Sequence, residues 1–208
     1  MNKIEAFNQS LFLWINAGVN TPSWALDTAI VLADDLIYLI PVLLSVLWLW
    51  GDGVRRNQAI KACLVTLLAL GANQVIGLVW QHPRPFMIGL GHAWIPHAAD
   101  SSFPSDHLTV FAGIGLTLLF GGAFRMAAAV LATGFAVAWA RVFLGLQFPL
   151  DMVGAVAVAG AAYVVVSPLW RMAGDTLTNL AEKLYRTVFA HPIASGWVRR
   201  ESADVTHC

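Results

Sequence analysis

Three short polar segments hold most of the side chains in this chain that are capable of chemistry. Their sequences are QHPRPF at 81–86, AADSSFPSDH at 98–107 and RVFLGLQFPLD at 141–151. Among their residues are Arg84, Ser105, His107, Arg141 and Asp151. Guanidinium groups bind phosphate oxygens in a bidentate manner, and the N-terminus of a helix that begins near a serine favours anions. If the three segments meet, their residues predict an anion site, and phosphate is the anion that fits best.

Each segment taken alone also has an ordinary structural explanation. Pro-Ser-Asp at 104–106, before an apolar run, is typical of any helix N-terminus, and Pro149 followed by Asp151 is an ordinary helix start. His107 alone is consistent with an interfacial histidine, and Arg84 alone with an anchor whose charged end extends to the membrane surface. The presence of all three segments on one side of a membrane favours a common site over these separate explanations.

The composition places the elements that carry these segments in a membrane. Apolar residues make up 58 % of the 208 residues, charged residues only 12 %, and mean hydropathy is +0.68. Soluble proteins usually contain roughly 25 % charged residues. The formal net charge is zero, so nothing indicates a nucleic-acid partner. We find no cluster of carboxylates that would require a metal, and we expect no cofactor.

A membrane-spanning helix needs about 20 mostly apolar residues. Five segments approach this length, at about 32–50, 59–80, 105–120, 124–143 and 149–170. Residues 4–17 are apolar but short, which favours an interfacial helix, with a sixth span as the alternative. We therefore predict an all-α integral membrane protein, a bundle of five or six transmembrane helices with interfacial N- and C-terminal helices. The whole chain, 1–208, is expected to form one domain, with an interfacial helical region at 1–30 and a cytoplasmic tail at 171–208.

The basic residues predict the orientation of this bundle. With five spans, one side receives nine of the twelve basic residues: Arg55, Arg56, Lys61, Arg125, Arg171, Lys183, Arg186, Arg199 and Arg200. The other side receives Lys3, Arg84 and Arg141. Because short cytoplasmic loops carry an excess of Lys and Arg, we expect a multi-pass membrane protein whose three polar segments face the exterior.

The three segments also match a known pattern. The chain resembles the type-2 phosphatidic acid phosphatase superfamily of membrane lipid phosphatases, which carries Lys, six residues, then Arg-Pro; Pro-Ser-Gly-His; and Ser-Arg, five residues, His, three residues, Asp. The corresponding residues here are Arg84-Pro85, then Pro104 to His107, then Ala140-Arg141, Gln147 and Asp151. Asp106 in place of Gly, the RPF ending and the lead-in to Ser105 are similar to bacterial undecaprenyl-diphosphate phosphatases of the bacitracin-resistance type.

The resemblance implies a mechanism and a substrate. The third-motif histidine attacks the terminal phosphorus and forms a phosphohistidine, Asp151 orients that imidazole, and His107 protonates the leaving oxygen. Arg84, Ser105, Asp106 and Arg141 are then expected at the phosphate. The implied reaction converts undecaprenyl diphosphate to undecaprenyl phosphate and inorganic phosphate at the outer face of a bacterial inner (cytoplasmic) membrane, toward the periplasm or exterior. Other lipid phosphates suit the same residues, and oligomeric state is not indicated.

The chain departs from the family pattern at three positions. Gly77 stands where the first-motif Lys is expected, with Gln81 or His82 as possible substitutes, and Ala140 replaces a serine. Gln147 occupies the position of the nucleophile, and a carboxamide nitrogen is a poor nucleophile because its lone pair is delocalised into the carbonyl. Loss of a nucleophile lowers turnover by up to about a million-fold.

Three explanations of Gln147 stay open. It can be an engineered substitution that inactivates the enzyme. It can be natural, with another nucleophile such as a loop histidine or His107. It can also mark a natural relative that binds lipid phosphates without hydrolysing them. Of the remaining ionisable residues, Asp34 and Asp35 are expected at the membrane interface, which argues against a transporter, whereas the roles of the loop histidines His82, His92 and His97 are left undecided.

Overall fold

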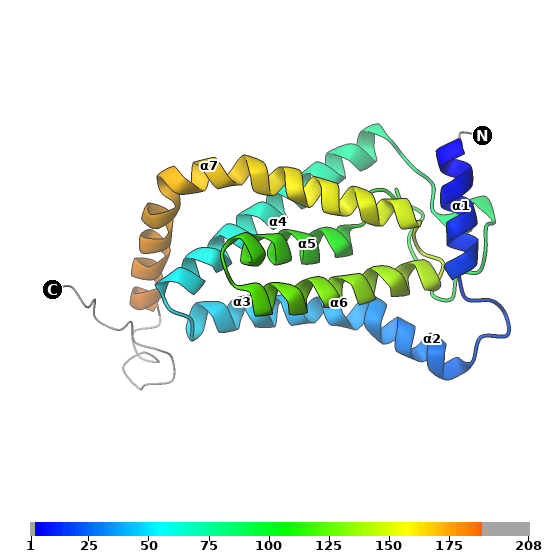
Figure 1. Ribbon diagram of the computed structural model, residues 1–208, viewed down its shortest axis with the longest axis horizontal. Helices are drawn as coiled ribbons and strands as arrows, with labels where there is room; N and C mark the ends of the chain where they lie inside the picture. The colour runs from blue at the N-terminus through cyan, green and yellow to red at the C-terminus, as the bar shows by residue number, and fades with distance from the viewer. Residues whose placement is uncertain (1–2, 189–208) are drawn as a thin grey trace.

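The computed structural model of the chain describes residues 3–188, and over this range it contains helices and no strand. The long helices run along one axis, and a short helix lies across one end of them (Figure 1). The main helices are α1 (Lys3–Ile15), α2 (Ser23–Ile30), α3 (Leu39–Leu49), α4 (Gly53–Val79), α5 (Asp106–Phe120), α6 (Phe124–Phe143) and α7 (Pro149–Val188). Short helical turns add Val31–Asp35, Leu36–Tyr38 and Pro85–Ile88.

Four helical segments are long and apolar enough to cross a membrane: Ser23–Leu49, Gly53–Val79, Phe124–Phe143 and Pro149–Thr187. Large apolar side chains such as Leu67, Phe135 and Val164 are exposed on their outer faces, as expected for surfaces that contact lipid rather than water. The all-helical membrane bundle predicted from the sequence is therefore confirmed.

The remaining predicted span, at about 105–120, is the shortest of the five; it forms α5, which lies in the middle of the bundle. It packs against α4, α6 and α7, and Leu108, Phe111, Ile114 and Leu118 are buried in the largest apolar core. Gly134 of α6 allows a close approach, because a Cβ there would collide with the Phe111 side chain at its Cβ. Since neighbouring helices surround α5, its first turn lies inside the bundle end rather than at its rim.

The first span begins earlier than the sequence predicted. The helical segment that contains it starts at Ser23 instead of about 32, so residues 23–30 belong to the span and not to the interfacial region expected at 1–30. The predicted span already contained Asp34 and Asp35 but left out Asp27, which is exposed and does not end the helical segment. A π-helical turn, Val31–Asp35, connects α2 to the rest of the segment.

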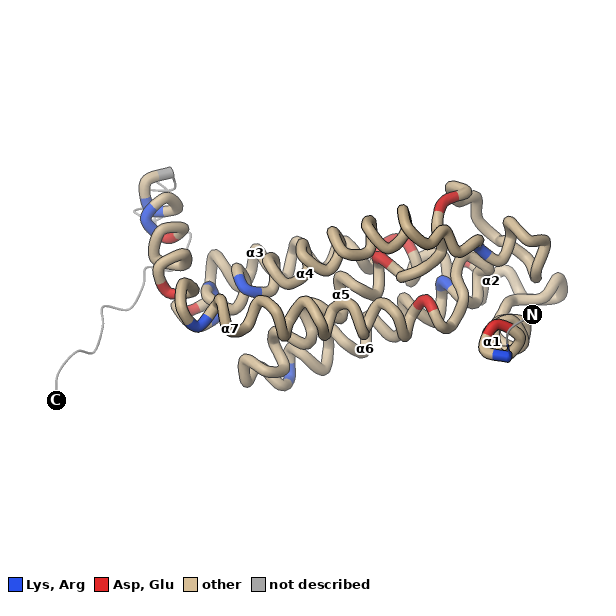
Figure 2. Tube along the Cα trace, turned by 90° about the horizontal axis from the view of Figure 1, so that it is seen from above, with Lys and Arg blue, Asp and Glu red and all other residues tan. Residues whose placement is uncertain are grey.

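α1 lies across the end of the bundle where α6 and α7 are joined, as Figures 1 and 2 both show. Its buried Asn8 accepts a hydrogen bond from the Leu150 backbone N–H (3.1 Å), and Phe12 packs edge-on against Phe148 (5.3 Å between ring centroids). At 13 residues, α1 is shorter than a membrane span requires. Its length is consistent with the predicted interfacial helix, and its contacts hold the turn between α6 and α7.

α7 continues well beyond the predicted end of its span at 170. Figure 1 shows its last part turned across the opposite end of the bundle, after Pro168, which removes one helix hydrogen bond. Residues 171–188 are therefore helical, whereas residues 189–208 of the expected cytoplasmic tail lie outside the described residues. Figure 2 shows that most Lys and Arg residues gather at this end.

Candidate active site

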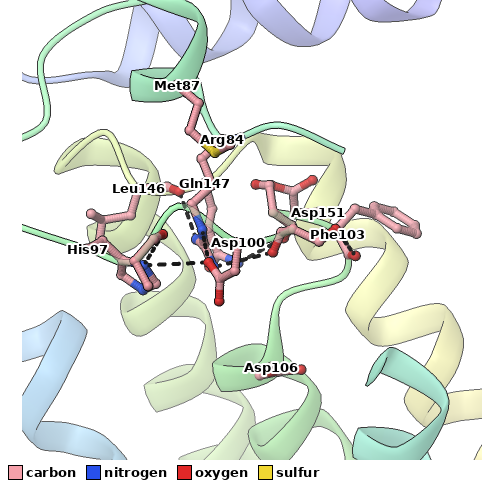
Figure 3. Close-up of polar contacts among 12 residues, drawn as sticks. Arg84, Met87, His97, Asp100, Phe103, Asp106, Leu146, Gln147 and Asp151 are labelled. Atoms are coloured by element: carbon pink, nitrogen blue, oxygen red, sulfur yellow. Dashed lines mark hydrogen bonds and ion pairs between the residues drawn. The ribbon is translucent and has the colours of Figure 1, made fainter. Parts of the chain in front are cut away.

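The three polar segments meet at the end of the bundle that α1 covers. A cavity of about 490 Å³ lies there, and among its lining residues are Arg84, His97, Asp100, Asp106, His107, Arg141 and Gln147. Figure 3 shows Arg84, His97, Asp100 and Gln147 grouped where the loop before α5 passes the turn after α6. Two of the predicted residues, Ser105 and Asp151, are buried behind this cavity at 0 % and 1 % exposure. The convergence expected from the sequence is therefore present.

Arg84 is almost completely buried and is fixed by three acceptors. Its Nε donates to Asp100 Oδ1 (2.8 Å), and its terminal nitrogens donate to the carbonyl oxygens of Leu146 (3.0 Å) and Ser101 (3.4 Å). Pro85 follows at the start of a short helical turn, and this turn sets the direction of the chain after Arg84. The guanidinium thus faces the cavity with one exposed carboxylate, Asp100, as its counter-ion.

Arg141 lies in the last turn of α6 and is 2 % exposed. Its Nε donates to Gln147 Oε1 (2.8 Å). One terminal nitrogen lies 3.1 Å from His97 Nε2, and the other lies 3.4 Å from His107 Nε2. The second of these nitrogens is also 3.8 Å from Asp34 Oδ1. Arg141 therefore connects the α6–α7 turn to both histidines that line the cavity beside it.

The Gln147 amide is held at both ends. Its oxygen accepts from Ser105 Oγ (2.8 Å) as well as from Arg141 Nε, and its nitrogen donates to the Ser102 carbonyl oxygen (3.2 Å). The turn that presents it requires Gly145, whose φ of +82° places it in the left-handed region. Gln147 consequently joins α5, α6 and the loop before α5, and its amide nitrogen is committed to a carbonyl.

Asp151 has a partner that sequence reasoning missed. It accepts a hydrogen bond from Ser102 Oγ and a second one from the Phe148 backbone N–H (2.7 Å). Among the described residues no hydrogen bond joins it to Gln147, the position that it was expected to orient, and its Oδ1 is buried with no hydrogen-bond partner. The carboxyl group is therefore anchored by the loop before α5 and keeps one acceptor unused.

Asp106 and Ser105 open α5 in different ways. Ser105 is the N-cap and accepts from the Leu108 backbone N–H (3.4 Å). The Asp106 carboxylate turns toward α4, where Asn73 Nδ2 (2.8 Å) and Gln74 Nε2 (3.2 Å) donate to it. A carboxylate has no proton to offer a phosphate, so the Asp106 side chain holds α5 against α4 beside the cavity.

The position of the missing first-motif Lys is an open part of the cavity wall. Gly77 lines the cavity, as do both candidate substitutes, Gln81 and His82. His82 points its Nε2 toward Glu5 of α1 (3.4 Å) and packs its ring against Phe148. Gln81 is exposed, so of the two it has the freer side chain to reach a bound anion.

Two residues of the site had no signal in the sequence because they come from segments without a motif. Asp34 was expected at the membrane interface, yet the π-helical turn brings it to Arg141. His97 comes from the loop before α5, which is tied down nearby by hydrogen bonds from Trp94 to Ala17 and Leu144. Partial burial, followed by the charges of Arg84 and Arg141, holds the pKa of His97 below its ordinary value. His92, the other histidine of this loop, is exposed and does not line the cavity.

Comparison with known proteins identifies a family and several similar proteins. Residues 58–175 match the family model of the PAP2 superfamily. The chain is 37 % identical to Escherichia coli (strain K12) YbjG, whose name provisionally assigns it as an undecaprenyl-diphosphatase, over 94 % of this chain and 99 % of YbjG. It is 29 % identical to undecaprenyl-diphosphatase BcrC of Bacillus subtilis (strain 168), over 89 % of this chain and 97 % of BcrC.

Two solved structures share the fold. The crystal structure of Aquifex aeolicus LpxE superposes with a TM-score of 0.62 at 20 % identity, over 76 % of this chain and 93 % of LpxE. A transmembrane PAP2-type phosphatidylglycerolphosphate phosphatase from Bacillus subtilis gives a TM-score of 0.59 at 17 % identity, over 83 % of this chain and 88 % of that protein. At these identities the likeness concerns the helical bundle alone.

Proposed function

Because the chain belongs to the PAP2 superfamily, a family of membrane phosphatases, we propose that it hydrolyses the terminal phosphate of a polyprenyl diphosphate, with undecaprenyl diphosphate as the substrate. The substrate follows the names of YbjG and BcrC, which match the chain over nearly its full length. The product pair is undecaprenyl phosphate and inorganic phosphate. We propose a single lipid-phosphatase domain over residues 1–208 as the unit that carries this activity.

The observation that carries the proposal is the pair of buried guanidinium groups at one cavity. Arg84 and Arg141 are 5 % and 2 % exposed, and both line the cavity. Two buried cations in one wall repel each other unless anions neutralise them, and a diphosphate supplies that charge together with oxygens in a geometry that guanidinium forks match. Asp100, an exposed carboxylate on Arg84, is the group that an entering phosphate displaces.

The cavity wall also suits a lipid. Leu78 and Met87 line it beside the polar residues, and Leu78 is 77 % exposed on the outer face of α4. A diphosphate head group in the cavity can therefore keep its polyprenyl chain against the apolar surface of the bundle, in the bilayer. This arrangement favours a lipid over a free diphosphate.

We propose that the site faces the exterior of a bacterial cytoplasmic membrane. Arg84 and Arg141 line the cavity at the site end of the bundle, whereas most Lys and Arg residues lie at the other end, where the last part of α7 turns across the bundle (Figure 2). An excess of Lys and Arg marks the cytoplasmic side.

The family mechanism suggests a role for each residue at the cavity. Arg84 and Arg141 bind the phosphoryl oxygens and stabilise charge in the transition state, whereas Ser105 donates its hydroxyl proton to Gln147 and so positions that side chain beside Arg141. His107, which lines the cavity next to Arg141, transfers protons. Position 147, where the family has its nucleophile, lies close to Arg141 and Ser105 but carries an amide, so attack on phosphorus cannot come from there.

A second function is favoured by the bonding of Gln147. Because both ends of its amide are engaged, the site is ordered without a nucleophile at this position, as a protein that captures diphosphate lipids without hydrolysing them requires. Capture and hydrolysis differ in turnover and share the same phosphate contacts.

Phosphate release from undecaprenyl diphosphate in detergent tests the proposal. The variants are the chain as given, Gln147→His, and each of these with Arg84→Ala. We expect release by at least one of the two parents and its loss with Arg84→Ala, because Arg84 binds the phosphoryl oxygens. Release by Gln147→His alone would assign the chain as given to lipid capture, and release by neither would refute the phosphatase site.

A further inference from the structure

His97 lies where a nucleophile for the phosphoryl group would have to lie. Its Nε2 is 3.1 Å from a terminal nitrogen of Arg141, one of the two guanidinium groups proposed to hold the phosphate. Its side chain is 24 % exposed and lines the cavity. An oxygen of a phosphoryl group bound to Arg141 would therefore be a direct neighbour of Nε2.

The contacts of His97 select the tautomer that a nucleophile needs. Its Nδ1 lies 3.2 Å from the Ala98 carbonyl oxygen, which can only accept, so Nδ1 carries the proton. In the neutral ring Nε2 then holds the free lone pair, and this nitrogen faces the N–H of Arg141. Both neighbours thus assign the same form, in which the Nε2 lone pair accepts from the Arg141 N–H at the cavity wall. A phosphate oxygen that takes over this N–H would release the lone pair for attack.

A carboxylate is placed to stabilise the ring when it becomes cationic. Asp100 Oδ1 is 2.8 Å from Arg84 Nε and 3.9 Å from His97 Nδ1. A phosphate that binds Arg84 repels this carboxylate, which is 60 % exposed and free to move toward His97. The substrate itself would therefore complete a histidine–carboxylate pair of the kind that activates nucleophiles.

The other described histidines fit this role less well. His82 is directed to Glu5, and His92 lies outside the cavity. His107 lies beside the opposite terminal nitrogen of Arg141 (3.4 Å), and within the described residues it has no carboxylate or carbonyl partner that would fix its tautomer. His97 and His107 thus stand at the two terminal nitrogens of the same guanidinium, which suits one nucleophile and one proton carrier.

We propose that His97 is the nucleophile of this chain and replaces the family histidine that Gln147 displaced; the inference rests on the proposed phosphatase function. The Nε2 lone pair forms a bond to the terminal phosphorus while the bond from phosphorus to the bridging oxygen breaks. That oxygen keeps the electron pair and leaves as the terminal oxygen of undecaprenyl phosphate. A phosphate monoester is a good leaving group, so this first step needs no strong acid.

The second step returns the enzyme to its starting state. A water oxygen bonds to the phosphorus of phospho-His97, the N–P bond breaks with its electron pair returning to Nε2, and inorganic phosphate leaves. The proton of the water passes to His107 Nε2 and from there to solvent. Gln147 keeps its bonds to Arg141 and Ser105 throughout, so its role is to hold the phosphate-binding groups in place.

The test compares purified variants in detergent, with undecaprenyl diphosphate labelled in its terminal phosphate. Initial rates are measured for the chain as given, His97→Gln, and the control His92→Gln, a histidine of the same loop that does not line the cavity. The single variant Gln147→His and the double variant His97→Gln with Gln147→His ask whether the family nucleophile substitutes for His97. The acid-labile phosphoryl label on the chain as given is mapped to its residue by mass spectrometry.

We expect His97→Gln to lower phosphate release by about a thousand-fold or more, His92→Gln to leave it within about two-fold, and the double variant to recover it. Recovery of phosphate release in the double variant would also show that the protein still folds when His97 is replaced by glutamine. The label should lie on His97. Release by His97→Gln within a few-fold of the parent, or label on His107, would overturn the assignment. Release by Gln147→His with none by the parent would overturn it while leaving the family site intact, whereas no release by any variant would refute the phosphatase function itself.

Discussion

Replacement of Arg141 by lysine tests the phosphate site most directly, because it keeps the positive charge and removes only the geometry. The guanidinium uses Nε to hold Gln147 at 2.8 Å and directs its two terminal nitrogens to the side of the cavity where His97 and His107 lie. A lysine has one ammonium group on a flexible stem. It can approach Gln147 or the cavity, but it cannot hold both.

The expected loss follows from this division of donors. A lysine at position 141 would give up at least one charge-assisted hydrogen bond to the bound phosphate, and such bonds contribute about 1.5–3 kcal/mol. Since about 1.4 kcal/mol is a factor of ten, Arg141→Lys should weaken diphosphate binding by about 10- to 150-fold. Loss of the Nε donor to Gln147 acts in the same direction, because the amide oxygen is buried.

The assay is the dissociation constant of undecaprenyl diphosphate in detergent, measured by isothermal titration calorimetry with His97→Gln in every protein, so that the lipid is not expected to be hydrolysed during the titration. Arg125→Lys is the matched control, since Arg125 lies in the first turn of the same helix, α6, and is exposed at the opposite end of the bundle. We expect the control to bind like the parent. Equal affinity of Arg141→Lys and Arg125→Lys would show that the guanidinium fork does not contact the phosphate.

Two further predictions concern the groups around the site. Ser102→Ala should lower the thermal unfolding temperature in detergent more than the control Ser101→Ala does. It removes a hydrogen-bond donor from the buried Asp151 carboxyl group, which costs about 1–3 kcal/mol of stability. Equal unfolding temperatures of the two variants would contradict this prediction. The pKa of His97 lies below its ordinary value, and the unprotonated ring is the proposed nucleophile, so the acid limb of kcat/KM against pH should lie below the range of a free histidine. Asp100→Asn removes a charge that raises this pKa and should move the acid limb to still lower pH, whereas a shift to higher pH would exclude His97 as the titrating group.

Much of the fold was predictable because apolar length is a local property. Each of the five apolar segments became a helix of the bundle, and the polar segments between them came to one end, as alternation of spans requires. The errors lie at helix boundaries. The first span was predicted to begin at about 32 and begins at Ser23, because a charge on the exposed face of a helix, such as Asp27, does not end it.

The candidate site was also predictable only where the information is local in the sequence. Motif spacing predicted four candidate site residues, each of which stands at a fixed distance from a helix end: Arg84, Ser105, Arg141 and Asp151. The partners of these residues were not predicted, because they depend on which loop passes which helix: Asp151 is held by Ser102 and not by position 147.

Residue type and spacing were enough to identify a helical membrane protein and to predict a phosphate site at one end of it, with Gln147 where the family resemblance places the nucleophile. Those conclusions depend on residue type and spacing along the chain. Only the tertiary structure decided that His97 and Asp100, from a loop with no periodic pattern, lie beside the two arginines. The physical reason is that a loop is positioned by contacts made far away in sequence, such as those of Trp94 with Ala17 and Leu144, and local spacing carries no record of them.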